Sequence, residues 1–228
     1  MDLRELLQHL KVYKALALGG SLGCSILWCY AELFTTNYFT RMIFVDQSPL
    51  QNSTLDGWDS RYCNRGMNSA PAVAAMQMAL SLAPDTVYSG TTAICLAYRS
   101  HPRDSDEVTH AMRDEDEAFF LGEARRGDAE WFGKLMADHT ALDWRDSIRS
   151  TFGPGSGSFT KVLVIASTRS GCFPAAGPMT VVDFVNGETE EDSKKLAQGV
   201  VIDWGGHWCY WENPESFNKL VLDFLDKP

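Results

Sequence analysis

The chain has 228 residues, of which 45% are hydrophobic and 22% are charged, and its formal net charge is −10. These values are ordinary for a globular protein with one domain, or with a core domain and one insertion, and they exclude disordered and fibrous chains. Because so acidic a surface repels phosphate backbones, the composition argues against nucleic-acid binding and favours a small neutral substrate.

Neither a membrane span nor a disulfide framework is expected. No run of about 18 consecutive apolar residues is present, and residues 1–14 alternate charged residues with leucine, unlike a signal peptide. The six cysteines form no C-x-x-C pair and mostly have apolar neighbours, so we predict reduced, mainly buried thiols in a cytoplasmic protein with no membrane partner. They are Cys24, Cys29, Cys63, Cys95, Cys172 and Cys209.

The first part of the chain predicts one strand–helix–strand unit. Residues 2–10 place leucines at helical spacing and predict an opening helix. Residues 13–18 and residues 41–45 are short apolar runs that end at turn-forming residues, as buried parallel strands do. Residues 25–34 lie between them and are apolar on most sides, which predicts a buried helix. Such βαβ units build parallel sheets.

From about residue 56 to residue 140 the pattern becomes helical, with little strand signal. Four helical segments are predicted, at residues 70–82, 91–98, 114–122 and 129–137. The acidic run at residues 103–117 is typical of a solvated helix face or loop. We therefore expect a helical insertion in an α/β core.

The rest of the chain returns to the α/β pattern after a Gly/Ser/Pro-rich linker at residues 152–159. The predicted elements are strands at residues 161–166 and 199–204, a strand or a helix at 180–185, a helix or polar connector at 191–198, and a closing amphipathic helix at 214–225. The expected organisation is core residues 1–58, a helical cap at residues 59–140 and further core residues 141–228.

A G-x-S-x-G pattern, Gly19-Gly20-Ser21-Leu22-Gly23, lies between a predicted strand and a predicted helix. A sharp strand-to-helix turn forces its central residue into a left-handed conformation, and small flanking residues let the strand and the helix approach. The Ser21 hydroxyl would stand above the sheet edge near a helix N-terminus, which favours developing negative charge. We interpret Ser21 as a nucleophile; a phosphate-binding turn or a plain βα connection is the alternative.

A serine nucleophile needs a base, and His207 is the best candidate among five histidines. It follows the last predicted strand, behind two glycines that let the loop bring the ring over the sheet. A purely structural histidine is the alternative. The other four lie on the opening helix or in the insertion: His9, His101, His110 and His139.

The acid that orients this imidazole should follow another strand. Asp46 comes directly after residues 41–45, so it and Ser21 end adjacent strands of one βαβ unit and share one edge of the sheet. We assign Asp46 as the acid; a turn-capping role is the alternative. The fallback carboxylates are Asp143 and Asp146, with Asp183 a weaker one.

These motifs together resemble the α/β-hydrolase superfamily, in particular its esterase and cofactor-free haloperoxidase-like members. GGSLG resembles the nucleophile elbow, and the order Ser…Asp…His matches the family. RMIFVDQSP resembles the strand after the elbow, which carries the acid in a subset of members. KVLVIASTRSGCFP resembles the next strand and loop, where most members place the acid; here Ser170 stands in its place, which supports Asp46. DHTALDWRD resembles the return from the cap, and GGHWCYWENPESFNKLVLDFL resembles the histidine loop and closing helix.

The resemblance implies an α/β-hydrolase-type, mostly parallel sheet with flanking helices and a helical cap. It also implies a serine hydrolase that cleaves a carboxylic ester or lactone of a small apolar substrate, with no cofactor. Ser21 would attack, His207 would transfer the proton, Asp46 would hold the imidazole, and the Leu22 N–H would stabilise the oxyanion. Halide-dependent peracid formation uses the same triad and stays open, as does a homodimer.

The predictions about the substrate pocket and about metal binding rest on less specific sequence patterns. Trp208 and Trp211 beside the histidine, together with Trp58, predict an aromatic pocket, with core packing as the alternative. No His/Cys cluster at ligand spacing is visible in the sequence, so we predict no metal.

The position of the serine motif raises a second hypothesis. Family members carry strands and one oxyanion loop before the elbow, whereas here the elbow begins at Gly19. We therefore expect an incomplete version of a longer protein, with the strand at residues 13–18 as an exposed edge. The competing hypothesis is an inactive hydrolase paralogue that acts as a binding protein.

Overall fold

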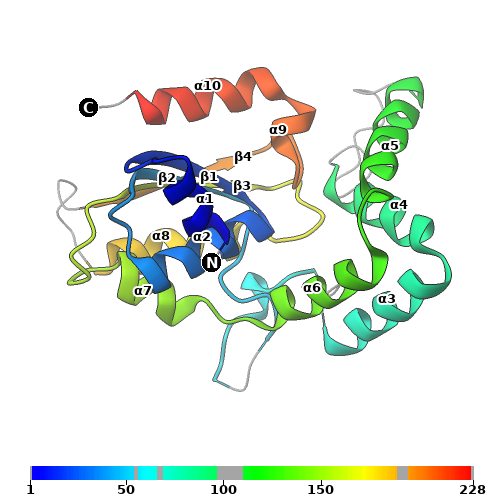
Figure 1. Ribbon diagram of the computed structural model, residues 1–228, viewed down its shortest axis with the longest axis horizontal. Coiled ribbons are helices and arrows are strands. Elements are labelled where there is room, and N and C mark those ends of the chain that lie inside the picture. The colour runs from blue at the N-terminus through cyan, green and yellow to red at the C-terminus, as the bar shows by residue number, and fades with distance from the viewer. Residues whose placement is uncertain (1, 54–55, 66–68, 97–109, 189–194, 227–228) are drawn as a thin grey trace.

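A four-stranded, fully parallel sheet forms the centre of the protein (Figure 1). The computed structural model describes residues 2–53, 56–65, 69–96, 110–188 and 195–226. The order of strands across the sheet equals their order in the chain: β1 (Ala15–Gly20), β2 (Phe39–Val45), β3 (Lys161–Ser167) and β4 (Ala197–Ile202). This arrangement confirms the predicted α/β class.

Each connection between neighbouring strands places a helix on the same face of the sheet. Crossovers between parallel strands are right-handed, so when each new strand is added on the same side of the previous one, all the connecting helices lie on one face of the sheet. The helices on that face are α2 (Leu22–Phe34), α7 (Arg145–Phe152) and α8 (Ala176–Asn186), joined by the opening helix α1 (Asp2–His9). The opposite face is covered by α9 (Cys209–Glu212) and α10 (Pro214–Leu225).

The two faces of the sheet bury separate apolar cores because side chains alternate along a strand. In β2, Met42 and Phe44 face α2, α7 and α8, whereas Ile43 and Val45 face α10. Strand β3 is buried along nearly its whole length, as expected for a central parallel strand.

The remaining helices lie beside the sheet, at the right of Figure 1. They are α3 (Ala70–Leu82), α4 (Pro84–Cys95), α5 (His110–Ala124) and α6 (Ala129–Ala141), and a short 3-10 turn, η1 (Ser60–Tyr62), precedes them. Helix α3 packs against α4 and α6, and α4 packs against α5. No helix in the described part of the chain is long and apolar enough to cross a membrane.

Most predicted elements are present with shifted ends. Helices α3 and α10 match their predicted bounds; α4 ends at Cys95, and residues 97 and 98 of the helix predicted there lie outside the described residues. The ambiguous residues 180–185 lie in helix α8. Residues 191–194 of a predicted helix or connector lie outside the described residues, and Ala197 and Gln198, which the same prediction included, begin β4 instead. Part of the acidic run, residues 103–109, also lies outside them.

Strand β1 extends through Gly19 and Gly20, beyond its predicted end, because both glycines pair with the last residues of β2. A Cβ atom on Gly19 would lie 2.5 Å from the carbonyl carbon of Gly23, in the first turn of α2. The absence of a side chain at Gly19 therefore lets α2 approach the end of β1.

We expect Gly19→Ala to lower the free energy of unfolding by about 1–3 kcal/mol, because backbone atoms of α2 would have to move. Gly23→Ala is the matched control: nothing lies within 4 Å of its added Cβ, and alanine favours a helix over glycine by about 1 kcal/mol. Urea denaturation followed by circular dichroism measures both. Equal destabilisation by the two substitutions would contradict this account of the junction.

Candidate active site

Ser21 occupies the single residue between β1 and α2. Its backbone is left-handed, with φ 50° and ψ −118°, and its N–H donates to the Val45 carbonyl at 3.0 Å. Such a φ is uncommon for a residue with a side chain and persists only where the surroundings impose it. The Ser21 hydroxyl does not cap α2; it donates to Gln47 Oε1 at 3.4 Å.

Asp46 directly follows β2, and only 1% of its surface is exposed. Its backbone is also left-handed, with φ 49°, and its N–H donates to the Ile165 carbonyl of β3 at 2.7 Å. The carboxylate accepts hydrogen bonds from Ser170 Oγ at 2.5 Å and from the Ser167 N–H at 3.3 Å. A buried carboxylate requires such donors to offset the loss of water.

His207 follows β4 and is buried, with 5% of its surface exposed. Its Nδ1 lies 2.6 Å from Asp46 Oδ2, so Nδ1–H donates to the carboxylate, and Nε2 is the ring nitrogen that does not contact Asp46. Burial acts to lower the pKa of His207, but Cys172 and Asp46 outweigh burial and shift this pKa upward. The structure thus brings Asp46 and His207 together as the sequence predicts.

Ser170 links this pair to the loop after β3. Its hydroxyl donates to Asp46 and accepts from the backbone N–H groups of Cys172 and Phe173, both at 3.1 Å. The sequence suggested Ser170 only as the residue in the place of a more usual acid. In the structure it holds the Asp46 carboxylate in position, a role that no sequence pattern indicated.

The fallback carboxylates lie elsewhere. Asp143 pairs with Arg145 at 2.7 Å, Asp146 pairs with Arg149 at 3.1 Å, and Asp183 is exposed on α8. Of the four carboxylates singled out from the sequence, Asp46 is the one that contacts His207.

The three predicted pocket tryptophans do not gather at one place. Trp208 packs on Phe120 of α5, with ring centroids 4.4 Å apart. Trp211 stacks on Phe119 of the same helix at 4.9 Å. Trp58 instead packs on Tyr62 and, at 6.4 Å, on Phe184 of α8. The structure therefore brings Trp208 and Trp211 together and leaves Trp58 apart from them.

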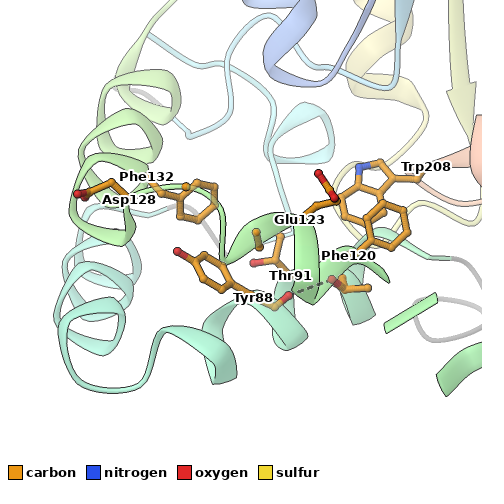
Figure 2. Close-up of a pocket in the computed structure, with 10 residues that line it drawn as sticks. Tyr88, Thr91, Phe120, Glu123, Asp128, Phe132 and Trp208 are labelled. Carbon is orange, nitrogen blue, oxygen red and sulfur yellow. Dashed lines mark hydrogen bonds between the residues drawn. The ribbon is translucent and has the colours of Figure 1, made fainter. Parts of the chain in front are cut away.

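Two cavities are lined by residues adjacent in sequence to Ser21 or His207. The first, shown in Figure 2, has a volume of about 280 Å³, and its aromatic lining consists of Tyr88, Phe120, Phe132 and Trp208. The second, of about 680 Å³, lies between α1, α2 and α6; its lining includes Leu22, Ile26 and His139. Both are mainly apolar.

A parallel sheet covered by helices on both faces, with a serine at a strand-to-helix turn and an Asp–His pair at the same edge, defines the class: this is the α/β-hydrolase fold. Solved structures confirm the fold. An esterase from Exiguobacterium antarcticum is 16% identical, with a TM-score of 0.77 over 99% of this chain and 72% of that chain. A bromoperoxidase from Bacillus anthracis is 14% identical, with a TM-score of 0.75 over 99% and 72%.

An enol-lactonase from Burkholderia xenovorans is 16% identical, with a TM-score of 0.72 over 99% of this chain and 71% of that chain. No protein-family model matches the chain, and no curated protein sequence matches it. At these identities the likeness concerns the fold.

His139 on α6 is a further buried titratable group at the larger cavity. Gln51 Nε2 lies 3.1 Å from His139 Nε2, a contact that requires the ring nitrogen to accept and hence a neutral ring. Burial and the nearby His207 lower the pKa of His139 to about 4. The sequence placed this histidine only within the helical insertion, because nothing local shows that the ring turns inward.

His139 should make the protein less stable as the pH falls from about 6.5 to about 4. Between these pH values His139 is protonated in the unfolded chain and neutral in the folded protein. The free energy of unfolding therefore rises with pH across this range, by roughly 3 kcal/mol in total. We expect His139→Gln to flatten this part of the pH dependence of urea unfolding. His9→Gln, at an exposed position of α1, is the control and should keep the wild-type slope. An unchanged slope in His139→Gln would contradict the neutral buried ring.

Proposed function

We propose that the chain is a serine hydrolase that cleaves a carboxylic ester or lactone of a small apolar substrate. The observation that carries the proposal is the 2.6 Å contact between His207 Nδ1 and Asp46 Oδ2, at the sheet edge where Ser21 occupies its left-handed turn. The names of the similar structures, which include an esterase and an enol-lactonase, favour ester or lactone chemistry.

In the proposed reaction, Ser21 Oγ attacks the substrate carbonyl while His207 Nε2 takes its proton. Asp46 keeps Nδ1 protonated, so the imidazole presents Nε2 to the serine and its positive charge is stabilised when it forms. The upward shift of the His207 pKa favours this imidazolium. Because Ser21 Oγ donates to Gln47 in the structure, the serine side chain must rotate toward His207 before attack.

The negative charge that develops on the substrate oxygen requires hydrogen-bond donors. Leu22 is the first residue of α2, so its N–H has no partner within the helix and lies at the positive end of the helix dipole. We assign this N–H as an oxyanion donor. His207 then returns its proton to the leaving alcohol, and water attacks the acyl-enzyme by the same route in reverse.

The apolar group of the substrate would occupy one of the two cavities beside these residues. The larger cavity begins at Leu22 and is lined largely by aliphatic and aromatic side chains, which suits an apolar acyl chain. Residues 59–140 would act as the cap, since Phe120 of α5 packs directly on Trp208, next to the histidine.

Ser21→Ala should lower ester hydrolysis by on the order of 10⁴-fold or more, because it removes the nucleophile and leaves the fold intact. The matched control is Ser147→Ala, which removes a buried hydroxyl without a hydrogen-bond partner on α7. Hydrolysis of short p-nitrophenyl esters measures the rate, and a fluorophosphonate probe followed by peptide mass spectrometry locates the label. Unchanged turnover in Ser21→Ala, or wild-type labelling at another residue, refutes the assignment. Absence of both labelling and turnover would favour the inactive-paralogue hypothesis.

Asp46→Asn should lower the rate by about 10⁴-fold, because an amide in this place no longer fixes the reactive tautomer of His207. Asp143→Asn changes the same functional groups at an ion-paired surface carboxylate and should alter the rate only slightly. The test compares kcat/KM of the two variants, with circular dichroism to verify folding. The reverse ranking would transfer the role of the acid to Asp143.

A further inference from the structure

Two cysteine side chains from separate parts of the chain lie beside His207 of the Asp46–His207 pair, and all three are residue types that can bind a metal ion. Cys95 ends α4, Cys172 lies in the loop after β3, and His207 follows β4. The two Sγ atoms and a ring nitrogen of His207 all lie within 4.8 Å of one another, and all three residues are buried. Spacing in the sequence, which led us to predict no metal, gives no indication of this cluster because the residues are 35 or more positions apart.

Hydrogen bonds of their main-chain atoms hold the two cysteines in place. The Cys172 N–H donates to Ser170 Oγ at 3.1 Å, and its carbonyl accepts from the Arg65 N–H at 3.0 Å. The Cys95 carbonyl accepts from the N–H of Trp208 at 3.0 Å, which ties the end of α4 to the residue after His207. The positions of the thiols are therefore coupled to the position of the imidazole.

The orientation of the His207 ring suits a metal ligand. Its Nδ1 contacts the Asp46 carboxylate at 2.6 Å, so we assign the other ring nitrogen, Nε2, as the coordinating atom. A carboxylate behind a histidine is the common outer partner in zinc sites, where it fixes the ring and increases its basicity. Ser170 and the Ser167 N–H hold that carboxylate in turn.

The donor set selects among cations. Two thiolates and one imidazole are soft to borderline ligands, which suit Zn²⁺ and disfavour Mg²⁺ and Ca²⁺. With Zn–S distances of about 2.3 Å, a tetrahedral ion places its sulfur ligands about 3.8 Å apart. The three donor atoms already lie within 4.8 Å of one another, so each sulfur–sulfur or sulfur–nitrogen distance exceeds the tetrahedral value by at most about 1 Å or slightly more.

We propose that Cys95, Cys172 and His207 form a binding site for a thiophilic divalent cation, with Zn²⁺ as the best fit and a fourth position open to water. Binding forms two metal–sulfur bonds and one metal–nitrogen bond, and the two thiol protons pass to solvent. Two thiolates balance the charge of the ion, so no uncompensated charge is added beside Asp46.

The site connects the proposed cap with the core, because Cys95 belongs to the cap and the other two ligands belong to the core. It also occupies the nitrogen that His207 would use as a base. If the proposed hydrolase function holds, Zn²⁺ inhibits the enzyme, and a chelator restores activity. This consequence rests on the proposed function, whereas metal binding itself does not.

The test uses the full chain, reduced with a phosphine and stripped of metal with EDTA. Zn²⁺ is titrated in competition with a chromophoric chelator, and elemental analysis gives the stoichiometry. We expect one ion per chain, and at least about 100-fold weaker binding in Cys95→Ser and in Cys172→Ser, since loss of an outer partner alone costs 10–100-fold. Cys29→Ser is the control, because Cys29 is half-buried on α2 and outside the cluster; it should bind like the wild type.

Wild-type protein that binds no Zn²⁺, or Cys95→Ser and Cys172→Ser variants that bind as tightly as Cys29→Ser, would overturn the proposal. Co²⁺ provides a second readout that needs no variant to fold. Coordination by thiolates should produce an intense near-ultraviolet charge-transfer band and strong visible bands of tetrahedral cobalt. The weak visible spectrum of octahedral cobalt would refute the site.

The two proposals fail separately. A chain that binds Zn²⁺ with the expected variant pattern but hydrolyses no ester loses the proposed function and keeps the metal site. A chain that hydrolyses esters but does not bind Zn²⁺ loses only the metal site.

Discussion

The arrangement of the site depends on the hydrogen bonds that the buried carboxylate of Asp46 accepts. Removing an ion from water costs several kcal/mol unless hydrogen bonds replace the lost solvent. Here the replacement comes from the end of β3, through Ser167, from the loop that follows it, through Ser170, and from the loop after β4, through His207. One negative charge thus determines the relative positions of three segments that the chain brings together from more than 100 residues away.

The pairing of β1 with β2 brings Ser21 to the edge of the sheet that carries Asp46. Gly20 pairs with Val45, so the residues that follow β1 and β2 come to the same edge, and the Ser21 N–H closes on the Val45 carbonyl. Both Ser21 and Asp46 adopt left-handed backbones immediately after their strands. The backbone hydrogen bonds of Ser21 to β2 and of Asp46 to β3 hold both residues in these conformations, and such strain is typical of functional sites.

The sequence predicts what depends on local pattern. Short apolar runs located β2 and β3, and their order with the helices indicated a parallel sheet, which places Ser21 and Asp46 at one edge by geometry alone. The contact between Asp46 and His207 follows from the same logic. The meeting of Cys95 with Cys172, the inward turn of His139 and the separation of Trp58 from Trp208 have no local signature. These features depend on the loops that position α4, α6 and the segment after β3 relative to the sheet. The sequence of a loop has no hydrophobic periodicity from which its path could be predicted.

Strand β1 has consequences for how the protein behaves in concentrated solution. Within the described residues it pairs only with β2, and its outward-facing Leu16 and Leu18 are 54% and 46% exposed. An open strand edge with apolar side chains is a template for a strand from another molecule. The net charge of −10 opposes such encounters by repulsion between molecules, which salt screens and acid removes. Colloidal stability therefore depends on a balance between the open edge at β1 and the surplus of carboxylates, and it is greatest in dilute buffer at neutral or higher pH.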